Sequence, residues 1–396
     1  MKKIMIIGAT WEQLPLLEQA KKMGLYVIAT DPNPDAEGFQ YADAKYIVNP
    51  RDLIQLDQIF FKEKPDAIIS DECDYSIFAV AYLTQKYNLP GPKIDSSLIT
   101  GNKYLQRKCA QKDRIPQPEF KLCFSYHDTE EAVDQLGLPV VIKPIDNRGS
   151  IGISKIENIK NLKIGFFNAI ANSYSRELIV EKFIEGLVVT VEGIYTDKFY
   201  NLTFSTKVMH PDYQFNAMQL AYPGNLAEKV KERLYAFTSR IVAETGINFG
   251  LTHTEFIVND EEIYFIEIAN RGGGVNISNK IVPSVTGIDV SDLLIKSAFG
   301  ERIPLDRFFP LPEMRCCILH FFDFGSGKLK KIANIDTIRS IKGILGIRIN
   351  IKKGDLLGDI ETAVHRPGFI IVTGKDNSGC LDLIREVEHK LKVKVE

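Results

Sequence analysis

The sequence has no long apolar run and no apolar leader. None of its 396 residues belongs to a stretch near the roughly 20 apolar residues of a transmembrane helix, so we expect no membrane partner. The first residues, Met1-Lys-Lys-Ile-Met-Ile-Ile-Gly8, run directly into the pattern of a buried strand. Because no signal region or small-residue cleavage site precedes that pattern, we expect a cytoplasmic protein.

An excess of charge of one sign is also missing. The 49 lysines and arginines stand against 51 acidic residues, which gives a net charge of −2. Dedicated nucleic-acid-binding proteins normally show a basic excess, so we expect no nucleic-acid partner. The six cysteines lack the spacing of a metal site, and a disulfide framework is not expected in so long a chain. Hydrophobic and charged contents of 45% and 25% are ordinary for a globular protein, and the length predicts two to three domains.

The N-terminal third lacks a complete dinucleotide-binding fingerprint, although its pattern is that of an α/β domain. Short apolar runs alternate with helical patterns in residues 1–112, which indicates βαβ units and a parallel sheet. Gly8-Ala-Thr-Trp11 does not complete a GxGxxG motif, so a dinucleotide site is poorly supported. Asp31, at the end of the second predicted strand, precedes Pro-Asn-Pro and is interpreted as a turn residue.

Proline clusters divide the rest of the chain. Ile115-Pro-Gln-Pro118 is one predicted boundary, and Ile303-Pro304 with Pro310-Leu-Pro312 is another. The domains that follow from these boundaries are 1–112, 113–305 and 306–396. Alternating apolar runs and a final helical segment predict that the last domain is a small α+β unit. Arg366, in His365-Arg-Pro-Gly, is interpreted as a turn residue of that unit.

Two glutamates, Glu255 and Glu267, lie in strand-like runs on either side of the polar segment Asn259-Asp260-Glu261, which predicts a β-hairpin. A three-residue loop would pair Glu255 with Glu267 on the same face, whereas a two-residue loop would send the carboxylates to opposite faces. Paired carboxylates about 5 Å apart repel unless a hard cation lies between them, and Mg²⁺ prefers such oxygens together with phosphate. The hairpin alone leaves a metal site and a solvated hairpin equally open.

Four elements upstream of the hairpin carry further polar residues. An apolar strand, Val140-Val-Ile-Lys143-Pro144, ends on a lysine, which indicates an anion there or a lysine that reaches the surface. The loop from Asp146 to Gly152 has two glycines and a serine, and such loops let backbone N–H groups approach phosphate. A second strand runs through Glu181-Lys-Phe-Ile into a polar hinge, and Glu192 lies among apolar neighbours in the strand that follows.

In this order, the motifs resemble those of the ATP-grasp superfamily, in its biotin-carboxylase-like branch of carboxylate–amine and L-amino-acid ligases. The resemblance implies an α/β and α+β fold with an N-terminal Rossmann-like (pre-ATP-grasp) domain, a central ATP-grasp fold whose lid subdomain covers about 113–183, and a small C-terminal domain. It implies ATP as a cofactor, with Mg²⁺ or Mn²⁺. The implied reaction joins a small carboxylate, such as an amino acid, to an amine through an acyl phosphate. Relatives commonly form homodimers, which is a further expectation.

The same resemblance implies roles for individual residues. The nucleotide would be bound by Lys103, Lys143, Gly149, Ser150, Gly152, Glu181, Lys182, Phe183, Ile184 and Glu192. The metal ligands would be Glu255, Glu267 and Asn270, and the catalytic cations Arg271 and Lys143. With both glutamates as metal ligands, the three-residue hairpin loop that pairs Glu255 with Glu267 becomes a structural prediction. The candidate substrate contacts would be His210, His253, Arg271, Gly272 and Gly273.

The sequence departs from the commonest family pattern at two positions. Ala269 stands where many relatives have the metal-binding Asn, which leaves Asn270 as a candidate only. Val188 occupies the usual position of a ribose-binding Glu, so the ribose contact is unassigned.

Two other functions remain open. One is a purine-biosynthesis-type ATP-grasp enzyme acting on a phosphoribosyl amine, although Asn270-Arg-Gly-Gly-Gly274 lacks the proline and the histidine-rich run of those relatives. The other is a non-catalytic ATP-binding regulatory protein, which the retained glutamates, lysines and Arg271 disfavour.

Overall fold

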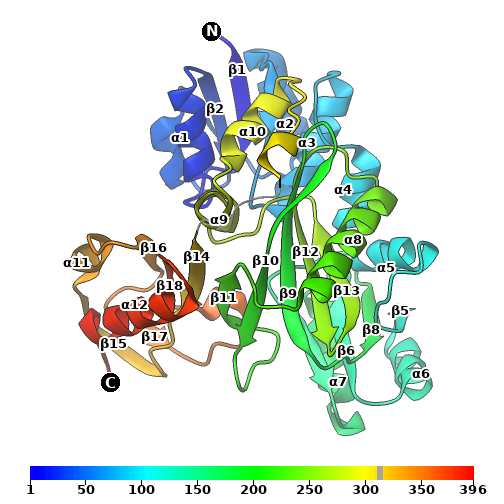
Figure 1. The fold of residues 1–396 in the computed structure, drawn as a ribbon. Helices are drawn as coiled ribbons and strands as arrows, with labels where there is room; N and C mark the ends of the chain where they lie inside the picture. The colour runs from blue at the N-terminus through cyan, green and yellow to red at the C-terminus, as the bar shows by residue number, and fades with distance from the viewer. Residues whose placement is uncertain (310–314) are drawn as a thin grey trace.

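A computed structural model describes residues 1–309 and 315–396 of the protein. The chain begins with a four-stranded parallel sheet in the order β3-β2-β1-β4, which confirms the predicted parallel sheet (Figure 1). Its strands are β1 (Lys3–Ile7), β2 (Tyr26–Asp31), β3 (Ala44–Ile47) and β4 (Ala67–Ile69). The proline group at 310–312 lies outside the described residues.

Both faces of this sheet are buried, as in other parallel sheets covered by helices. Ile4 and Ile6 pack into one core, whereas Met5 and Ile7 pack into the core on the opposite face. The first core contains side chains of α1 (Leu14–Lys22) and α10 (Val290–Ala298), and the second those of α2 (Leu53–Glu63) and α3 (Asp74–Lys86). Helix α10 therefore returns from late in the chain to cover the first sheet.

Two helices, α4 (Ile94–Thr100) and α5 (Lys103–Lys112), lead into a small antiparallel sheet in the order β5-β8-β6-β7. Its strands are β5 (Phe120–Cys123), β6 (Val140–Pro144), β7 (Ser154–Ile156) and β8 (Leu178–Lys182). Helices α6 (Tyr126–Leu136) and α7 (Leu162–Ala171) pack on it and share its core. A capping box fixes the start of α6, because Ser125 and Asp128 each bond the other's backbone N–H.

The largest sheet has eight strands and spans two of the predicted domains (Figure 1). In spatial order these are β13 (Glu262–Ala269), β12 (Gly250–Asn259), β9 (Leu187–Tyr195), β10 (Phe199–Met209), β11 (Ala217–Tyr222), β14 (Cys316–Phe321), β18 (Gly368–Gly374) and β16 (Ile344–Ile349). Helix α8 (Glu228–Thr245) packs its apolar residues on the first part of this sheet. The C-terminal strands are joined to the central ones by the β11–β14 pair, in which Ala221 lies opposite Ile318.

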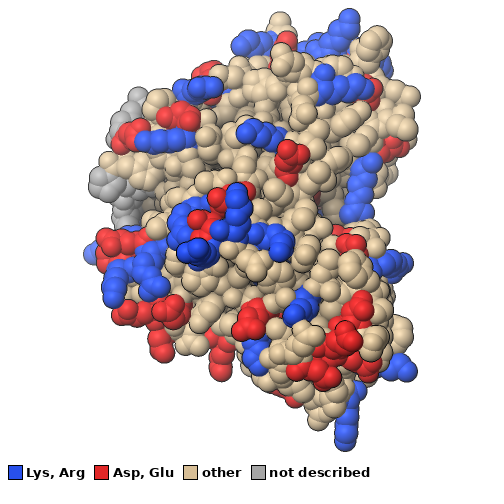
Figure 2. All heavy atoms as spheres, turned by 90° about the vertical axis from the view of Figure 1, so that its right-hand side faces the viewer, with Lys and Arg blue, Asp and Glu red and all other residues tan. Residues whose placement is uncertain are grey.

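The C-terminal segment adds α12 (Asn377–Lys390), α11 (Ile335–Arg339) and a three-stranded sheet of β15 (Gly327–Ala333), β17 (Leu356–Leu357) and β19 (Lys392–Val395). The remaining elements are short: η1 (Glu37–Tyr41), η2 (Ile159–Asn161), η3 (Ile277–Ile281), α9 (Val282–Thr286), η4 (Asp306–Phe308) and η5 (Ala363–His365). Within the described ranges, no helix has the length and apolar character needed to cross a membrane. Basic and acidic side chains are interspersed on the face shown in Figure 2, as the near-neutral net charge suggests.

Candidate functional site

The hairpin of β12 and β13 places Glu255 directly opposite Glu267, which confirms the predicted pairing. The predicted loop length is wrong, however, because Asn259 pairs with Glu262 and the loop therefore has two residues. A β-bulge reconciles the two observations: Glu255 and Phe256 are consecutive, but their partners Glu267 and Phe265 are separated by Ile266. The bulge shifts the pairing register by one residue, which is the shift that we had assigned to a third loop residue.

Burial explains why the bulge lies at Ile266. Ile263, Phe265 and Ile268 are almost completely buried in the core beneath α8. A regular strand would put residues 263, 265 and 267 on that face, and Glu267 would then enter an apolar core. With Ile266 bulged, Glu267 lies on the open face and Ile268 takes the core position. Bulges that re-aim a side chain in this way are common beside active sites.

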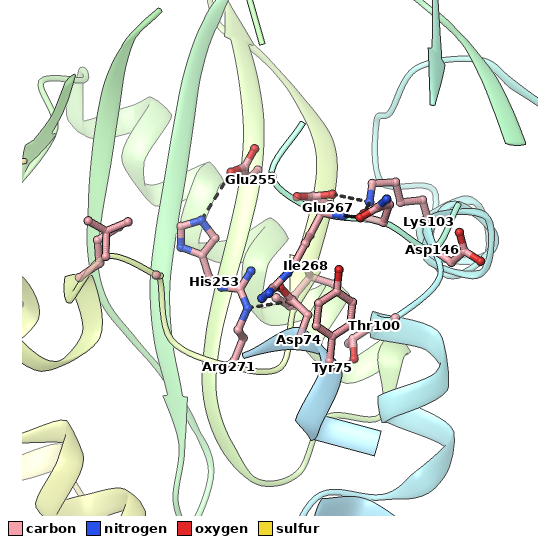
Figure 3. Close-up of a pocket in the computed structure, with 18 of the residues that line it drawn as sticks. Asp74, Tyr75, Thr100, Lys103, Asp146, His253, Glu255, Glu267, Ile268 and Arg271 are labelled. Carbon is pink, nitrogen blue, oxygen red and sulfur yellow. Dashed lines mark hydrogen bonds and ion pairs between the residues drawn. The ribbon is translucent and has the colours of Figure 1, made fainter. Parts of the chain in front are cut away.

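Each of the paired carboxylates has a lysine partner. The Nζ of Lys207, on β10, lies 2.6 Å from Oε1 of Glu255, and the Nζ of Lys103, at the start of α5, lies 3.3 Å from Oε2 of Glu267. Figure 3 shows both carboxylates facing the same cavity, with Lys103 beside Glu267. Burial opposes ionisation of Glu255, but Lys207 and His253 outweigh it and hold its pKa far below the ordinary value.

Two cavities meet at these glutamates. The larger, of about 640 Å³, is lined by residues of α3, of the hairpin and of β14, the first of the C-terminal strands. The smaller, of about 270 Å³, lies between the small antiparallel sheet and the large sheet. The residues that line both are Lys103, Asn147, Arg148, Gly149, Lys207, Ala217, Glu255, Glu267 and Arg366.

A buried ion triad forms one wall of the smaller cavity. Glu181 accepts a hydrogen bond from Nε of Arg107 at 2.7 Å and lies 2.7 Å from Nζ of Lys143. All three side chains are at most 5% exposed. Burial raises the pKa of Glu181, but Arg107 and Lys143 outweigh it and lower that pKa to about 2. Burial lowers the pKa of Lys143, although Glu181 partly compensates.

Arg107 was not identified from the sequence. The available signal was its position four residues after Lys103, which puts both side chains on one face of α5. Two nitrogens of its guanidinium, Nη1 and Nη2, are buried with no hydrogen-bond partner among the described residues. Its Cζ lies 5.5 Å from the centre of the Phe265 ring, so part of its charge is placed over an aromatic face.

The predicted hinge also lines the smaller cavity, through Glu181, Lys182, Phe183 and Ile184. The Nζ of Lys182 donates to the backbone oxygens of Gly137 and Leu138, at 3.0 and 3.2 Å, so its charge caps the end of α6. The Nζ of Lys155 lies 4.1 Å from the centre of the Phe183 ring.

The glycine-containing loop closes the smaller cavity. Gly149 and Ser150 line it, and both have positive φ, at 62° and 61°. Oγ of Ser150 donates to the backbone oxygen of Phe215 at 2.7 Å, which ties the loop to the β10–β11 connection. Gly152 does not line the cavity. It has a φ of 78°, and a Cβ there would lie 2.9 Å from Cβ of Asn172, so it serves the close packing of the turn.

His253 and Glu192 belong to a polar network under the larger cavity. Nδ1 of His253 lies 2.8 Å from Glu192, and its Nε2 lies 3.5 Å from Glu255. Burial lowers the pKa of His253, but Glu192 and Glu255 raise it to about 9. Glu192 is 2% exposed and also accepts a hydrogen bond from the Tyr222 hydroxyl at 2.9 Å. The structure thus puts Glu192 behind His253 rather than in the smaller cavity, contrary to its predicted nucleotide contact.

Arg271 joins the hairpin to the N-terminal domain. Its Nε lies 2.7 Å from Oδ1 of Asp74, on α3 (Figure 3). Nη1 of Arg148 lies 3.5 Å from the other oxygen of Asp74. Burial opposes the charge on Arg271, but Asp74 outweighs it and raises the pKa. Asp74 was not identified from the sequence, because it lies nearly 200 residues from its partner.

Two other predicted site residues, Asn270 and His210, lie away from both cavities. The amide of Asn270 donates to the backbone oxygens of Phe249 and Leu251, at 2.9 and 3.1 Å, on the side of the strand opposite Glu267. Nδ1 of His210 accepts hydrogen bonds from the backbone of Asp212, at 3.1 Å, and of Tyr213, at 3.3 Å, so this side chain organises its own loop.

Gly272 and Gly273 are packing positions. A Cβ on Gly272 would lie 2.3 Å from Cβ of Ser278, and one on Gly273 would lie 3.0 Å from Nδ1 of His253. The N–H of Gly272 donates to Oδ1 of Asp71 at 2.8 Å. The two glycines thus let the backbone approach its neighbours, and neither of them lines the larger cavity.

Comparisons with known proteins agree with this architecture. Residues 136–279 match the family model of the ATP-grasp domain, and residues 320–396 match that of L-amino acid ligase C-terminal domain 2. The formate-dependent phosphoribosylglycinamide formyltransferase of Saccharolobus solfataricus is 24% identical, with 99% of this chain and 97% of that protein covered. The protein of the same name from Prochlorococcus marinus strain AS9601 is 28% identical, over 68% of this chain and 70% of that one.

Two solved structures show the same fold along the whole chain. The L-amino acid ligase from Bacillus licheniformis superposes with a TM-score of 0.86 at 20% identity and covers 100% of this chain and 99% of that one. The phosphoribosylglycinamide synthetase from Anaerococcus prevotii gives a TM-score of 0.79 at 21% identity, with 100% of both chains covered.

Proposed function

The chain belongs to the ATP-grasp superfamily of ligases, and from this membership we propose that it is a carboxylate–amine ligase that forms an amide through an acyl phosphate. The acid substrate would be an amino acid or a similar small carboxylate. The observation that carries the proposal is the Glu255–Glu267 pair at the junction of two cavities, because one cavity can hold a nucleotide while the other holds the molecule that accepts its phosphoryl group.

The paired carboxylates fit Mg²⁺. The described residues contain no group of three His, Cys, Asp or Glu side chains that could bind a metal ion unaided. Mg²⁺ is commonly held by one or two carboxylates, with phosphate oxygens and water completing the shell. We therefore propose Glu255 and Glu267 as its protein ligands and omit Asn270, because its Oδ1 is buried and the residue lines neither cavity. When bound, the metal would offset charge on the transferred phosphoryl group.

The smaller cavity would take ATP. Lys143 provides a buried cation whose position is fixed by Glu181 and Arg107, and the hinge residues Phe183 and Ile184 present an apolar surface suited to a base. Lys103 lines both cavities and would contact the phosphates where they reach the junction. Because the Gly149–Ser150 loop lies over this region, its closure would exclude water from the acyl phosphate.

The larger cavity would take the acid and then the amine. Arg271, held by Asp74, would orient the substrate carboxylate, one oxygen of which attacks the γ-phosphorus as ADP leaves. The amine then attacks the acyl carbon, phosphate departs with the bridging oxygen, and the ammonium proton is released. No side chain of the protein needs to form a covalent bond, so the chain's contribution is charge, orientation and exclusion of water.

A purine-biosynthesis-type reaction is the second candidate, favoured by the names of the formyltransferase relatives. Formate is also a carboxylate, so the two functions share the activation step and differ in the substrates that the larger cavity admits. The C-terminal match to an L-amino acid ligase domain favours the first.

A phosphate-release screen tests the proposal. Purified protein with Mg²⁺ and ATP is offered pairs of amino acids and, separately, formate with a phosphoribosyl amine, and products are identified by mass spectrometry. ADP, phosphate and an amide from one pair would support the ligase, whereas a formylated amine alone would support the purine-type reaction. ATP bound without turnover in every mixture would favour the regulatory function. Glu267→Gln serves as the control and should abolish the signal.

A further inference from the structure

Arg366 is a basic residue at the junction of the two cavities. It follows η5 and precedes β18, so it comes from the C-terminal segment, and it lines both cavities. Its Cζ lies 3.8 Å from the centre of the Phe321 ring, which covers one face of the guanidinium. The sequence-based interpretation of Arg366 as a turn residue is therefore incomplete.

Two hydrogen bonds fix the orientation of this guanidinium. Nη2 donates to Oδ1 of Asn216 at 2.5 Å and to the backbone oxygen of Ala217 at 2.7 Å. Asn216 is itself fully buried and held by a hydrogen bond from its Nδ2 to the backbone oxygen of Ile360 at 2.8 Å. The guanidinium is therefore oriented before any ligand binds, which lowers the entropic cost of ligand binding.

Arg366 differs from the other basic residues at the junction. Lys103, Lys207 and Arg148 also line both cavities, and each has a carboxylate partner: Glu267, Glu255 and Asp74. Within residues 1–309 and 315–396, Arg366 forms no ion pair, and its Nε is buried without a hydrogen-bond partner. Burial without a counter-charge lowers its pKa to about 10. Arg366 is half-buried with a buried Nε, and cations withdrawn from water are normally paired, so a missing anion is indicated.

We propose that Arg366 binds an oxyanion at the junction, either the phosphoryl group in transfer or the carboxylate of the acid substrate. A planar guanidinium with one face stacked on an aromatic ring suits a carboxylate or phosphate, each of which presents two oxygens to it. The assignment of the two oxyanions rests on the proposed ligase reaction. It gives the C-terminal segment a direct part in substrate binding, which the position of Ala363 beside the Gly149 loop also favours.

Isothermal titration calorimetry of the full chain with Mg²⁺ and ADP tests this site. Inorganic phosphate is titrated in one arm and acetate in the other, for the wild type, Arg366→Met and Arg366→Lys. Arg385→Met is the matched control, because Arg385 is exposed on α12 and forms an ion pair with Asp382 on the same helix. We expect Arg366→Met to weaken phosphate or acetate binding by at least about tenfold, since a charged hydrogen bond is lost. Arg366→Lys should recover only part of that loss, and Arg385→Met should bind as the wild type does.

Each outcome separates the possibilities. Loss confined to phosphate assigns the transferred phosphoryl group, and loss confined to acetate assigns the acid substrate. Unchanged binding of both anions by Arg366→Met, or no binding of either by the wild type, overturns the inference and leaves the ligase proposal intact. If Arg366→Met does not fold, Arg366→Lys decides the question. The two proposals can also fail separately. If the wild type shows no turnover in the screen but its anion binding still depends on Arg366, the ligase function is contradicted and the anion site is supported.

Discussion

Glu255 lies directly opposite Glu267 because one residue between Phe265 and Glu267 is bulged out of the ladder. Without that bulge, the two-residue loop would leave Glu255 opposite Ile266 and turn Glu267 into the core beneath α8. The core residues Phe265 and Ile268 stay buried in the bulged strand, so the arrangement satisfies the packing of one face and the charge pairing of the other. The candidate metal site therefore depends on an irregularity in the strand.

Replacing Arg107 with Met should destabilise the protein strongly. The substitution leaves Glu181 buried with Lys143 as its one remaining ion partner among the described residues, and breaking a buried ion pair costs roughly 3–5 kcal/mol. Arg240→Met is the control, because the Arg240–Asp113 pair is substantially exposed and worth less than about 1 kcal/mol. Urea denaturation at neutral pH measures both. A loss below about 1 kcal/mol for Arg107→Met would show that the triad contributes little.

The same triad predicts a pH dependence. The pKa of Glu181 is lowered to about 2 in the folded protein, from the ordinary value of 4.5. A lowered pKa stabilises the fold above the unfolded-state value, and that stability is lost as the pH falls through the folded-state value. The stability advantage of the wild type over Glu181→Gln should therefore be constant above about pH 4.5. It should decrease by up to roughly 3 kcal/mol toward pH 2 in urea denaturation series. A constant difference down to pH 3 would contradict the charged state of Glu181.

Gly272→Ala should lower the free energy of unfolding. A Cβ at this position would lie 2.3 Å from Cβ of Ser278 and 3.0 Å from Oδ1 of Asp71, so the loop must shift, at a cost of about 1–3 kcal/mol. Gly358→Ala is the matched control, because a Cβ at Gly358 would meet no atom within 4 Å. Thermal or urea unfolding compares the two. Unchanged stability of Gly272→Ala, together with a weaker affinity for the acid substrate, would favour the sequence-based prediction that this glycine contacts substrate.

Much of the fold follows from local patterns. The parallel N-terminal sheet and the Glu255–Glu267 pairing were predicted and are confirmed, because strand periodicity and turn residues are local signals. The loop length was wrong because a bulge and an extra loop residue shift the register equally. Asn270 and Glu192 were placed in the site by motif position, but in the structure both are buried and neither lines one of the two cavities.

The residues missed by sequence analysis share a different cause. Asp74, Arg107 and Arg366 each act through a partner at least 74 residues away in the chain. No periodicity or spacing in a single sequence reveals such a pair, since it arises when separate domains meet. Arg366 also lies in a turn, which by itself predicts only a change of chain direction.

The Mg²⁺ dependence of nucleotide binding tests the central claim most directly. Calorimetry measures the affinity of ADP with and without Mg²⁺ for the wild type, Glu267→Gln and Glu262→Gln. Glu262 lies on the same strand but is exposed, away from the cavities. Mg²⁺ should tighten ADP binding to the wild type and to Glu262→Gln, and this gain should vanish in Glu267→Gln. An undiminished gain in Glu267→Gln would contradict the assignment of the Glu255–Glu267 pair as the metal site.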